Sequence, residues 1–171
     1  GRPAALPDGG LGGESESLDA LHQASRESWH PRRDLARDRL HVVSLGSFCG
    51  AKAAVQRLGL GEAHMPFDWI RTTAEGVQHF VESDFEGFFS IACQQSVPGT
   101  NLRMYRSERH SFWHDDISQA AVRTKLRRRC ERFLALAQDA KDLLFVRSCC
   151  TTEELPRLPG LLAALRACSS P

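Results

Sequence analysis

The pattern of apolar residues is clearest in one stretch near the start of the predicted domain. An apolar, β-branched run at residues 40–45 predicts a short buried strand. After a turn of small residues, residues 51–58 carry apolar side chains at helical spacing, and Gly59 is a suitable C-terminal stop. We therefore expect a strand, a tight turn and a helix in direct succession, with Cys49 where the helix begins.

Three later segments have the apolar spacing of helices. Residues 74–82 form the first, and residues 119–140 form the longest, with a basic side opposite its apolar stripe. The last helix is expected to begin near Leu158, because Pro156 and Pro159 restrict an earlier start. These segments predict helices between and after the strands.

Two further segments read as strands and one as a loop. The nearly continuous apolar run at residues 143–147 suits a parallel strand covered on both faces. Residues 101–109 alternate in polarity and predict a strand exposed on one face, whereas residues 93–100 are polar and predict a loop. The order of elements predicts an α/β fold with a mostly parallel sheet in a single domain.

The two ends of the chain differ from the middle. Residues 1–38 begin with many glycines and prolines, so we expect a disordered or low-complexity lead-in with a short helix. The predicted domain then covers residues 39–171. The chain starts with Gly1 rather than Met and ends abruptly at Pro171, which suggests a fold truncated at its C-terminus.

Composition narrows the classes of partner. The chain is 42% hydrophobic and 25% charged with a net charge of +1, so nothing points to nucleic acid or to a membrane surface. No apolar run approaches the length of a membrane span, and the N-terminus lacks the order of a signal peptide. The six cysteines contain no C-x2-C pair, so we expect no metal, no cofactor and a reducing, cytoplasmic compartment.

Cys49 is the candidate nucleophile. Free backbone N–H groups at the start of a helix favour an anion, so a thiol at that position tends toward the thiolate. The alternative is a buried cysteine of the core, which is the commoner role for this residue type.

His114 is the candidate base, because it lies between Trp113 and Asp115 in the segment RHSFWHDD. The alternative is a surface histidine in a polar loop. Candidates for a carboxylate that orients the ring are Asp139 and Asp142 downstream, with Asp115, Asp116 or Asp68 as alternatives. For Asp68, packing and local hydrogen bonding are the favoured roles. A zinc site using His110 and His114 would need ligands from separate segments to converge, and we do not expect one.

An ordered series of motifs extends this picture. The segments are SLGSFC, RLGL, MPFDWI, DFEGFF, FWHDD, RRRCERF and LLFVRS, and together they span residues 40–148. This series resembles a family of bacterial and algal domains described as papain-like cysteine peptidases. The resemblance implies Cys49 as nucleophile and His114 as its base. The chain departs from papain itself, whose cysteine opens a helix after a loop rather than after a buried strand.

Two functions follow from these observations. In the first, a cysteine-dependent hydrolase, Cys49 attacks an acyl carbon of a peptide or other small acyl substrate, and His114 moves the proton. The expected substrate-contacting residues are Ser47, Gly50, Trp69, Arg128 and Arg147. In the second, a non-catalytic binding module holds an anionic or sugar-like ligand beneath residues 67–69 through Arg128, Arg129 or Arg147.

Overall fold

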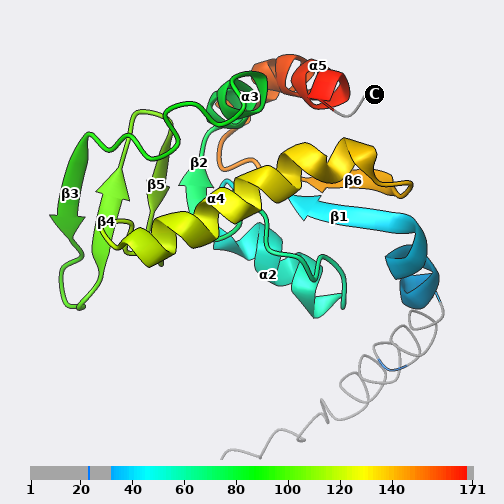
Figure 1. Cartoon of the computed structure of the whole chain (residues 1–171), viewed down its shortest axis with the longest axis horizontal. Helices are drawn as coiled ribbons and strands as arrows, with labels where there is room; N and C mark the ends of the chain where they lie inside the picture. The colour runs from blue at the N-terminus through cyan, green and yellow to red at the C-terminus, as the bar shows by residue number, and fades with distance from the viewer. Residues whose placement is uncertain (1–22, 24–31, 169–171) are drawn as a thin grey trace, which may run out of the picture.

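The computed structural model describes residue 23 and residues 32–168 of the chain (Figure 1). Most of the lead-in expected over residues 1–38 lies outside the described residues, and residues 32–39 are helical. The strands are β1 (Leu40–Ser44), β2 (Ile70–Thr72), β3 (Cys93–Ser96), β4 (Arg103–Arg106), β5 (His110–Phe112) and β6 (Asp142–Val146). The helices are α2 (Cys49–Arg57), α3 (Ala74–Glu82), α4 (Ala120–Leu134) and α5 (Leu158–Cys168), with 3₁₀ turns η1 (Ala135–Gln138) and η2 (Thr152–Arg157).

The strands form two sheets rather than one. β1 and β6 pair in parallel, with Leu40 opposite Asp142 and Ser44 opposite Val146. The other four strands form an antiparallel sheet in the order β2-β5-β4-β3. The prediction of a mostly parallel sheet is therefore wrong, although the α/β mixture is confirmed. The connections between β3, β4 and β5 are too short for the crossover that a parallel pair requires.

Local pattern predicted most elements close to where they lie. The strands expected around residues 40–45 and 143–147 are β1 and β6, and α5 begins at Leu158 as the prolines require. α2 begins earlier than expected, at Cys49, so the cysteine is its first residue. α4 ends sooner than the pattern indicated, because its last turns tighten into η1.

The loop predicted over residues 93–100 is wrong in its first half. Residues 93–96 form β3, which pairs with β4 from Cys93 opposite Arg106 to Ser96 opposite Arg103. All four β3 residues are exposed, so the strand carries no apolar alternation that would reveal it. The single strand expected over residues 101–109 is shorter, because a turn closed by Ser107 N–H and the His110 carbonyl at 2.9 Å follows β4.

Aromatic side chains fill the core between the sheets and helices. Phe67, Phe88 and Phe112 are fully buried, and Phe67 meets the Phe133 ring of α4 edge to face at 5.6 Å. α4 crosses in front of the sheets, while α3 and α5 pack side by side (Figure 1). The carboxyl end of β1 points toward β2, which brings the turn carrying Cys49 to the junction between the two sheets.

Candidate functional site

The turn between β1 and α2 has an unusual backbone. Gly46 and Ser47 have φ values of +72° and +80°, a region that L side chains avoid. A Cβ at Gly46 would lie 2.8 Å from Thr72 Cγ2 and 2.9 Å from the Phe67 carbonyl oxygen, so only glycine fits there. Ser47 is buried and nevertheless adopts the left-handed conformation. Strained residues of this kind are concentrated at functional sites.

Cys49 occupies the first position of α2 and is half-buried. The N-cap residue is Phe48, whose side chain accepts no hydrogen bond, and the first turn has no acidic residue. The Phe48 ring lies over Gly50, where a Cβ would be 2.1 Å from Phe48 Cε2. No described side chain therefore caps the N-terminal N–H groups of α2, which leaves the positive end of the helix available to an anion.

His114 is exposed just beyond the end of β5. Its ring meets the Trp69 ring edge to face, with centroids 6.3 Å apart. Among the described residues, no hydrogen bond joins His114 to Cys49 or to a carboxylate. The pairing of Cys49 with His114 therefore stays a prediction.

Asp68 is fully buried and faces α2. Its Oδ2 accepts from Lys52 Nζ and from the Met65 N–H, both at 2.9 Å. The Lys52 ammonium also donates to the carbonyl oxygens of Gly61 at 2.6 Å and Ala63 at 2.9 Å. This arrangement fastens the segment before β2 onto α2, as expected for the packing role of Asp68.

Asp115 is also engaged by a lysine. Its Oδ1 lies 2.6 Å from Lys125 Nζ of α4, and its side chain is 10% exposed. The neighbouring Asp116 accepts from Ser118 and Tyr105, and these hydrogen bonds, that of Ser118 most strongly, hold its pKa below the usual range. Neither Asp68 nor Asp115 forms a hydrogen bond or ion pair with His114 in the part of the chain that the structure describes.

The predicted substrate-contacting arginines lie in different environments. The Arg147 side chain is 5% exposed and donates to the carbonyl oxygens of Leu45 and Thr72, each at 2.9 Å. It also pairs with Glu154 at 2.8 Å. Arg147 thus joins β1, β2 and η2, whereas Arg128 is exposed on α4. The structure does not bring these two arginines together in one site.

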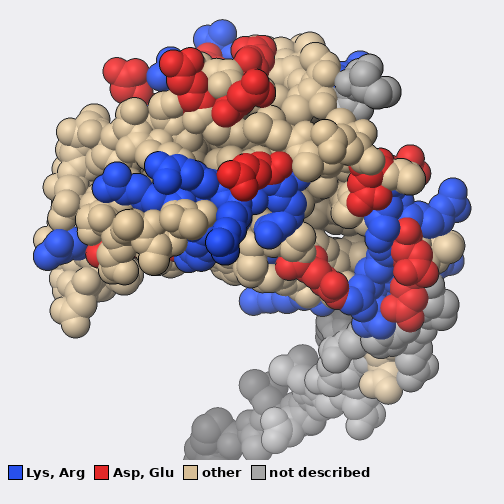
Figure 2. Space-filling view, in the orientation of Figure 1, with Lys and Arg blue, Asp and Glu red and all other residues tan. Residues whose placement is uncertain are grey.

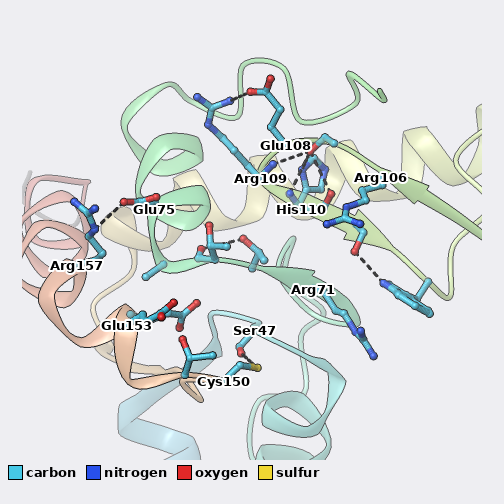
Figure 3. A pocket seen from close by; sticks show the side chains of 18 of the residues that line it. Ser47, Arg71, Glu75, Arg106, Glu108, Arg109, His110, Cys150, Glu153 and Arg157 are labelled. Atoms are coloured by element: carbon cyan, nitrogen blue, oxygen red, sulfur yellow. Dashed lines mark hydrogen bonds and ion pairs between the residues drawn. The ribbon is translucent and has the colours of Figure 1, made fainter. Parts of the chain in front are cut away.

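A pocket of about 610 Å³ opens beside the carboxyl ends of β1 and β6 (Figure 3). Ser47 reaches it from the turn that carries Cys49, and its Oγ lies 2.9 Å from Cys150 Sγ. Cys49 and His114 are not among the residues that line this pocket. Its arginines are Arg71, Arg106, Arg109 and Arg157, and Arg71 stacks over Trp113 at 4.2 Å.

Sequence reasoning missed Cys150 as a pocket residue. The signal was present, because ligands in α/β folds often bind at the carboxyl ends of parallel strands and Cys150 follows the second such strand. Lys52 and His64 were missed as well. Lys52 is almost fully buried although it lies in a short helix, and no local pattern marks a lysine that will pair with an aspartate from another segment.

The other cysteines differ in environment. All six are free, and burial raises the pKa of the Cys130 thiol to about 12. Burial also raises the pKa of Cys168. Cys93 and Cys150 are exposed. Cys130 is therefore expected to be inert at neutral pH, which makes it an internal reference for reactivity.

The described residues contain no group of three or more His, Cys, Asp or Glu side chains arranged to hold a metal ion. His110 is buried in the core, with Nδ1 2.6 Å from Ser107 Oγ and Nε2 2.9 Å from the Phe88 carbonyl oxygen. Both ring nitrogens already have protein partners, so His110 has none left for a metal. Among the described helices, none is long and apolar enough to cross a membrane.

Comparison with known proteins identifies the family. A family model described as "Putative papain-like cysteine peptidase" matches residues 40–169. The chain belongs to this family. It is also 26% identical over 133 residues to "Uncharacterized protein R408" of Acanthamoeba polyphaga mimivirus, covering 61% of this chain and 60% of that relative. The match thus spans about 60% of the relative's length, and no solved structure matches the chain significantly.

Proposed function

We propose that this family member is a cysteine-dependent hydrolase in which the Cys49 thiolate attacks the acyl carbon of a peptide or other small acyl substrate. The observation that carries the proposal is the place of Cys49, as the first residue of an uncapped helix after a left-handed turn. This strand-to-helix turn is similar in form to the one that presents the nucleophile of other hydrolases.

The chemistry requires one base and a pair of hydrogen-bond donors. In the proposed reaction His114 takes the Cys49 thiol proton as the C–S bond forms, and the N–H groups of Cys49 and Gly50 stabilise the oxyanion. The bond to the leaving group then breaks, and His114 returns the proton to that group. Water, deprotonated by His114, releases the acid and restores the thiol.

Support for His114 comes from its surroundings. Its ring is exposed and has no hydrogen bond that fixes it elsewhere among the described residues, so it is free to approach a bound substrate. The Trp69 ring packs against the His114 ring, with 6.3 Å between the two ring centroids. Catalytic hydrogen bonds often shorten only when substrate is bound.

The substrate is proposed to contact the turn and its neighbours. Ser47 links the turn to the 610 Å³ pocket, and Gly50 offers an N–H beside the nucleophile. Trp69 is half-buried and close to His114. We assign Arg147 to holding the fold rather than the substrate, because its hydrogen bonds go to Leu45, Thr72 and Glu154.

The experiment that tests the proposal measures the alkylation rate of each cysteine by mass spectrometry as a function of pH. At pH 6.5 we expect Cys49 to react about tenfold faster than the exposed Cys93, since a thiolate is the reactive form. Cys130 is expected to stay unmodified. His114→Ala should remove most of the advantage of Cys49 and leave the rate of Cys93 unchanged.

Two results would contradict the assignment. If Cys49 is alkylated at the same rate as Cys93 across the pH range, Cys49 is not an activated nucleophile. If Cys49 is alkylated as fast in His114→Ala as in wild type, His114 is not the base, although Cys49 can still be the nucleophile. Hydrolysis of an activated ester such as p-nitrophenyl acetate, lost in Cys49→Ser and retained in Cys150→Ser, separates the two cysteines at the sheet ends.

The alternative proposal is a non-catalytic binding module of the same fold. It is favoured by the amount of positive charge on α4, which the hydrolase mechanism does not use. A binder should retain its affinity for an anionic ligand in Cys49→Ser, whereas an enzyme loses turnover in that variant.

A further inference from the structure

We propose that α4 and the segment before β2 form a binding site for the phosphoryl group of a small molecule. The site, called here the α4 pocket, is a hollow of about 750 Å³ lined by His64 and by Lys125, Arg128, Arg129 and Arg132. Figure 2 shows lysine and arginine side chains gathered along α4. The site does not depend on the chemistry proposed for Cys49.

Arg129 is the central observation. The residue is only 8% exposed, and its Nη1 is buried with no hydrogen-bond partner among the described residues. No carboxylate of the described chain lies within ion-pair distance of its guanidinium. An unpaired buried charge is costly, because the solvation it loses is not replaced.

The buried charges near Arg129 do not balance. Lys52 and Asp68 are both buried and pair with each other at 2.9 Å. Asp68 Oδ2 also accepts from the Met65 N–H, and Asp68 Oδ1 is buried with no hydrogen-bond partner among the described residues, so neither oxygen pairs with Arg129. One buried carboxylate therefore serves two buried cations, and an anion in the α4 pocket would supply the missing negative charge.

The outer cations of the α4 pocket are also largely unneutralised. Arg128 has no hydrogen bond or ion pair among the described residues. Arg132 Nη1 donates to the His64 carbonyl oxygen, which is a neutral partner. Lys125 is the exception, because it pairs with Asp115 at 2.6 Å. Two guanidinium groups are thus without any charged partner, and a third has only a carbonyl.

His64 provides an uncharged donor beside these cations. Burial is the largest cause that lowers the pKa of His64, and the positive charges of Lys52, Arg129 and Arg132 lower it further. The negative charge of Asp68 has the opposite effect but does not outweigh them. The ring is therefore neutral at pH 7. Trp69 Nε1 lies 3.4 Å and Asp68 Oδ2 3.7 Å from His64 Nδ1, so the described partners of the ring are at Nδ1 and Nε2 is left for a ligand.

The donor set favours a phosphoryl group of a small molecule. Guanidinium groups offer planar pairs of N–H donors that match phosphate oxygens, and a dianion suits more than one of them. The pocket volume of about 750 Å³ is that of a small-ligand site. The chain's net charge of +1 does not suit an extended polyanion, which needs excess positive charge over a broad surface.

The α4 pocket adjoins the candidate active site. The centroid of the Trp69 ring lies 6.5 Å from that of the His64 ring and 6.3 Å from that of the His114 ring. Asp115, next to His114, holds Lys125 of the pocket. Trp69 therefore lies between a lining residue of the α4 pocket, His64, and the proposed base, His114, although Trp69 itself does not line the pocket.

The test is calorimetric titration of the folded chain with phenyl phosphate and with inorganic phosphate, at constant ionic strength set by sodium chloride. We expect both probes to bind the wild-type chain. Arg128→Gln should weaken phenyl phosphate binding by about tenfold, the cost of one charge-assisted contact. Arg127→Gln is the matched control on the same helix, because Arg127 lies over Phe89 and outside the pocket. The affinity of the Arg127→Gln variant for phenyl phosphate should stay within about twofold of wild type.

Arg129 needs a variant that separates binding from folding. Arg129→Met removes the unpaired buried charge, so in urea denaturation it should be at least as stable as wild type while losing phenyl phosphate binding. Arg129→Lys keeps the charge without the planar pair of donors and should bind more weakly than wild type. Equal binding by wild type and Arg129→Met would overturn the proposal.

Three further results would also overturn it. One is a titration with phosphate that releases or absorbs no more heat than a titration with sodium chloride. Another is equal weakening in Arg127→Gln and Arg128→Gln, which would indicate only general charge attraction. The third is sedimentation of the chain with phosphatidic acid vesicles without any binding of phenyl phosphate, which would indicate a lipid surface instead. Cys49→Ser should bind phenyl phosphate like wild type, so failure of the hydrolase proposal is measured separately.

Discussion

Lys52 Nζ lies 2.9 Å from Asp68 Oδ2, and both side chains are almost completely removed from water, at 2% and 0% exposure. The pair joins the helix that begins with Cys49 to the segment that leads into β2. Since Lys52 is one turn after Cys49, the pair holds the N-terminal end of α2 to the segment before β2. The net contribution of such a pair to stability is small, because the lost hydration of both charges offsets their attraction, but removal of one partner leaves the other charge uncompensated.

Breaking the Lys52–Asp68 pair should destabilise the chain. Asp68→Ala leaves the Lys52 ammonium buried without its charged partner, so we expect the free energy of unfolding in urea to fall by about 3 kcal/mol or more. The matched control is Asp139→Ala, which breaks the more exposed His41–Asp139 pair at 2.6 Å and should cost less than about 1 kcal/mol. Unchanged stability in Asp68→Ala together with lost ester hydrolysis would instead favour the orienting role.

Arg147 is predicted to act in folding. Arg147→Lys cannot reach the Leu45 and Thr72 carbonyl oxygens and Glu154 at once, so its free energy of unfolding should fall by about 2 kcal/mol. Arg157→Lys, at an arginine whose side chain is 62% exposed, should change stability by less than about 0.5 kcal/mol. Calorimetry should give the same phenyl phosphate affinity for Arg147→Lys as for wild type. A weaker affinity would return Arg147 to the ligand site.

Two glycines with the same backbone conformation allow the cost of backbone strain to be measured separately from the cost of a steric clash. Gly46 and Gly99 have φ values of +72° and +74°, but a Cβ at Gly99 would have no atom within 4 Å. Gly99→Ala should therefore cost about 1 kcal/mol of stability. Gly46→Ala should cost about 3 kcal/mol, because its Cβ would meet Thr72 and the Phe67 carbonyl as well. Equal losses in urea denaturation would show that the turn adjusts freely.

His110 should make the fold sensitive to acid. Burial lowers its pKa in the folded chain to about 4, from 6.5 for the free residue. Below pH 6.5 the unfolded chain takes up a proton that the folded chain does not, so this group lowers stability as pH falls from 6.5 to 4. The loss should total about 3 kcal/mol and be absent above pH 6.5.

The comparison that isolates this contribution is urea denaturation of wild type and His110→Gln at pH 4.5 and pH 7.5. The variant should lose less stability between the two pH values than wild type does. Asp116 and Asp139, whose pKa values are lowered chiefly by hydrogen bonds from Ser118 and His41, add an acid sensitivity that is common to both proteins. The same pH dependence in the two proteins would show that His110 does not titrate as a buried group.

Sequence pattern was most informative where structure depends on neighbours along the chain. The strand, turn and helix around Cys49 were predictable because apolar periodicity and Gly59 specify them locally. The cap of α3 is likewise local, since Thr73 Oγ1 accepts from the Gly76 N–H at 3.0 Å. β3 was missed because an exposed edge strand needs no apolar alternation.

The sequence by itself determined the position of Cys49 at a helix start, the apolar faces of the helices and the family to which the motifs belong. Only the tertiary structure decided that four of the strands pair antiparallel and that Asp68 faces Lys52. It also decided that Arg129 Nη1 is buried with no hydrogen-bond partner among the described residues. The physical reason is the distance along the chain over which each interaction acts. Periodicity and capping act within a few residues, whereas strand pairing and the partners of buried charges are set by the packing of segments far apart in the chain.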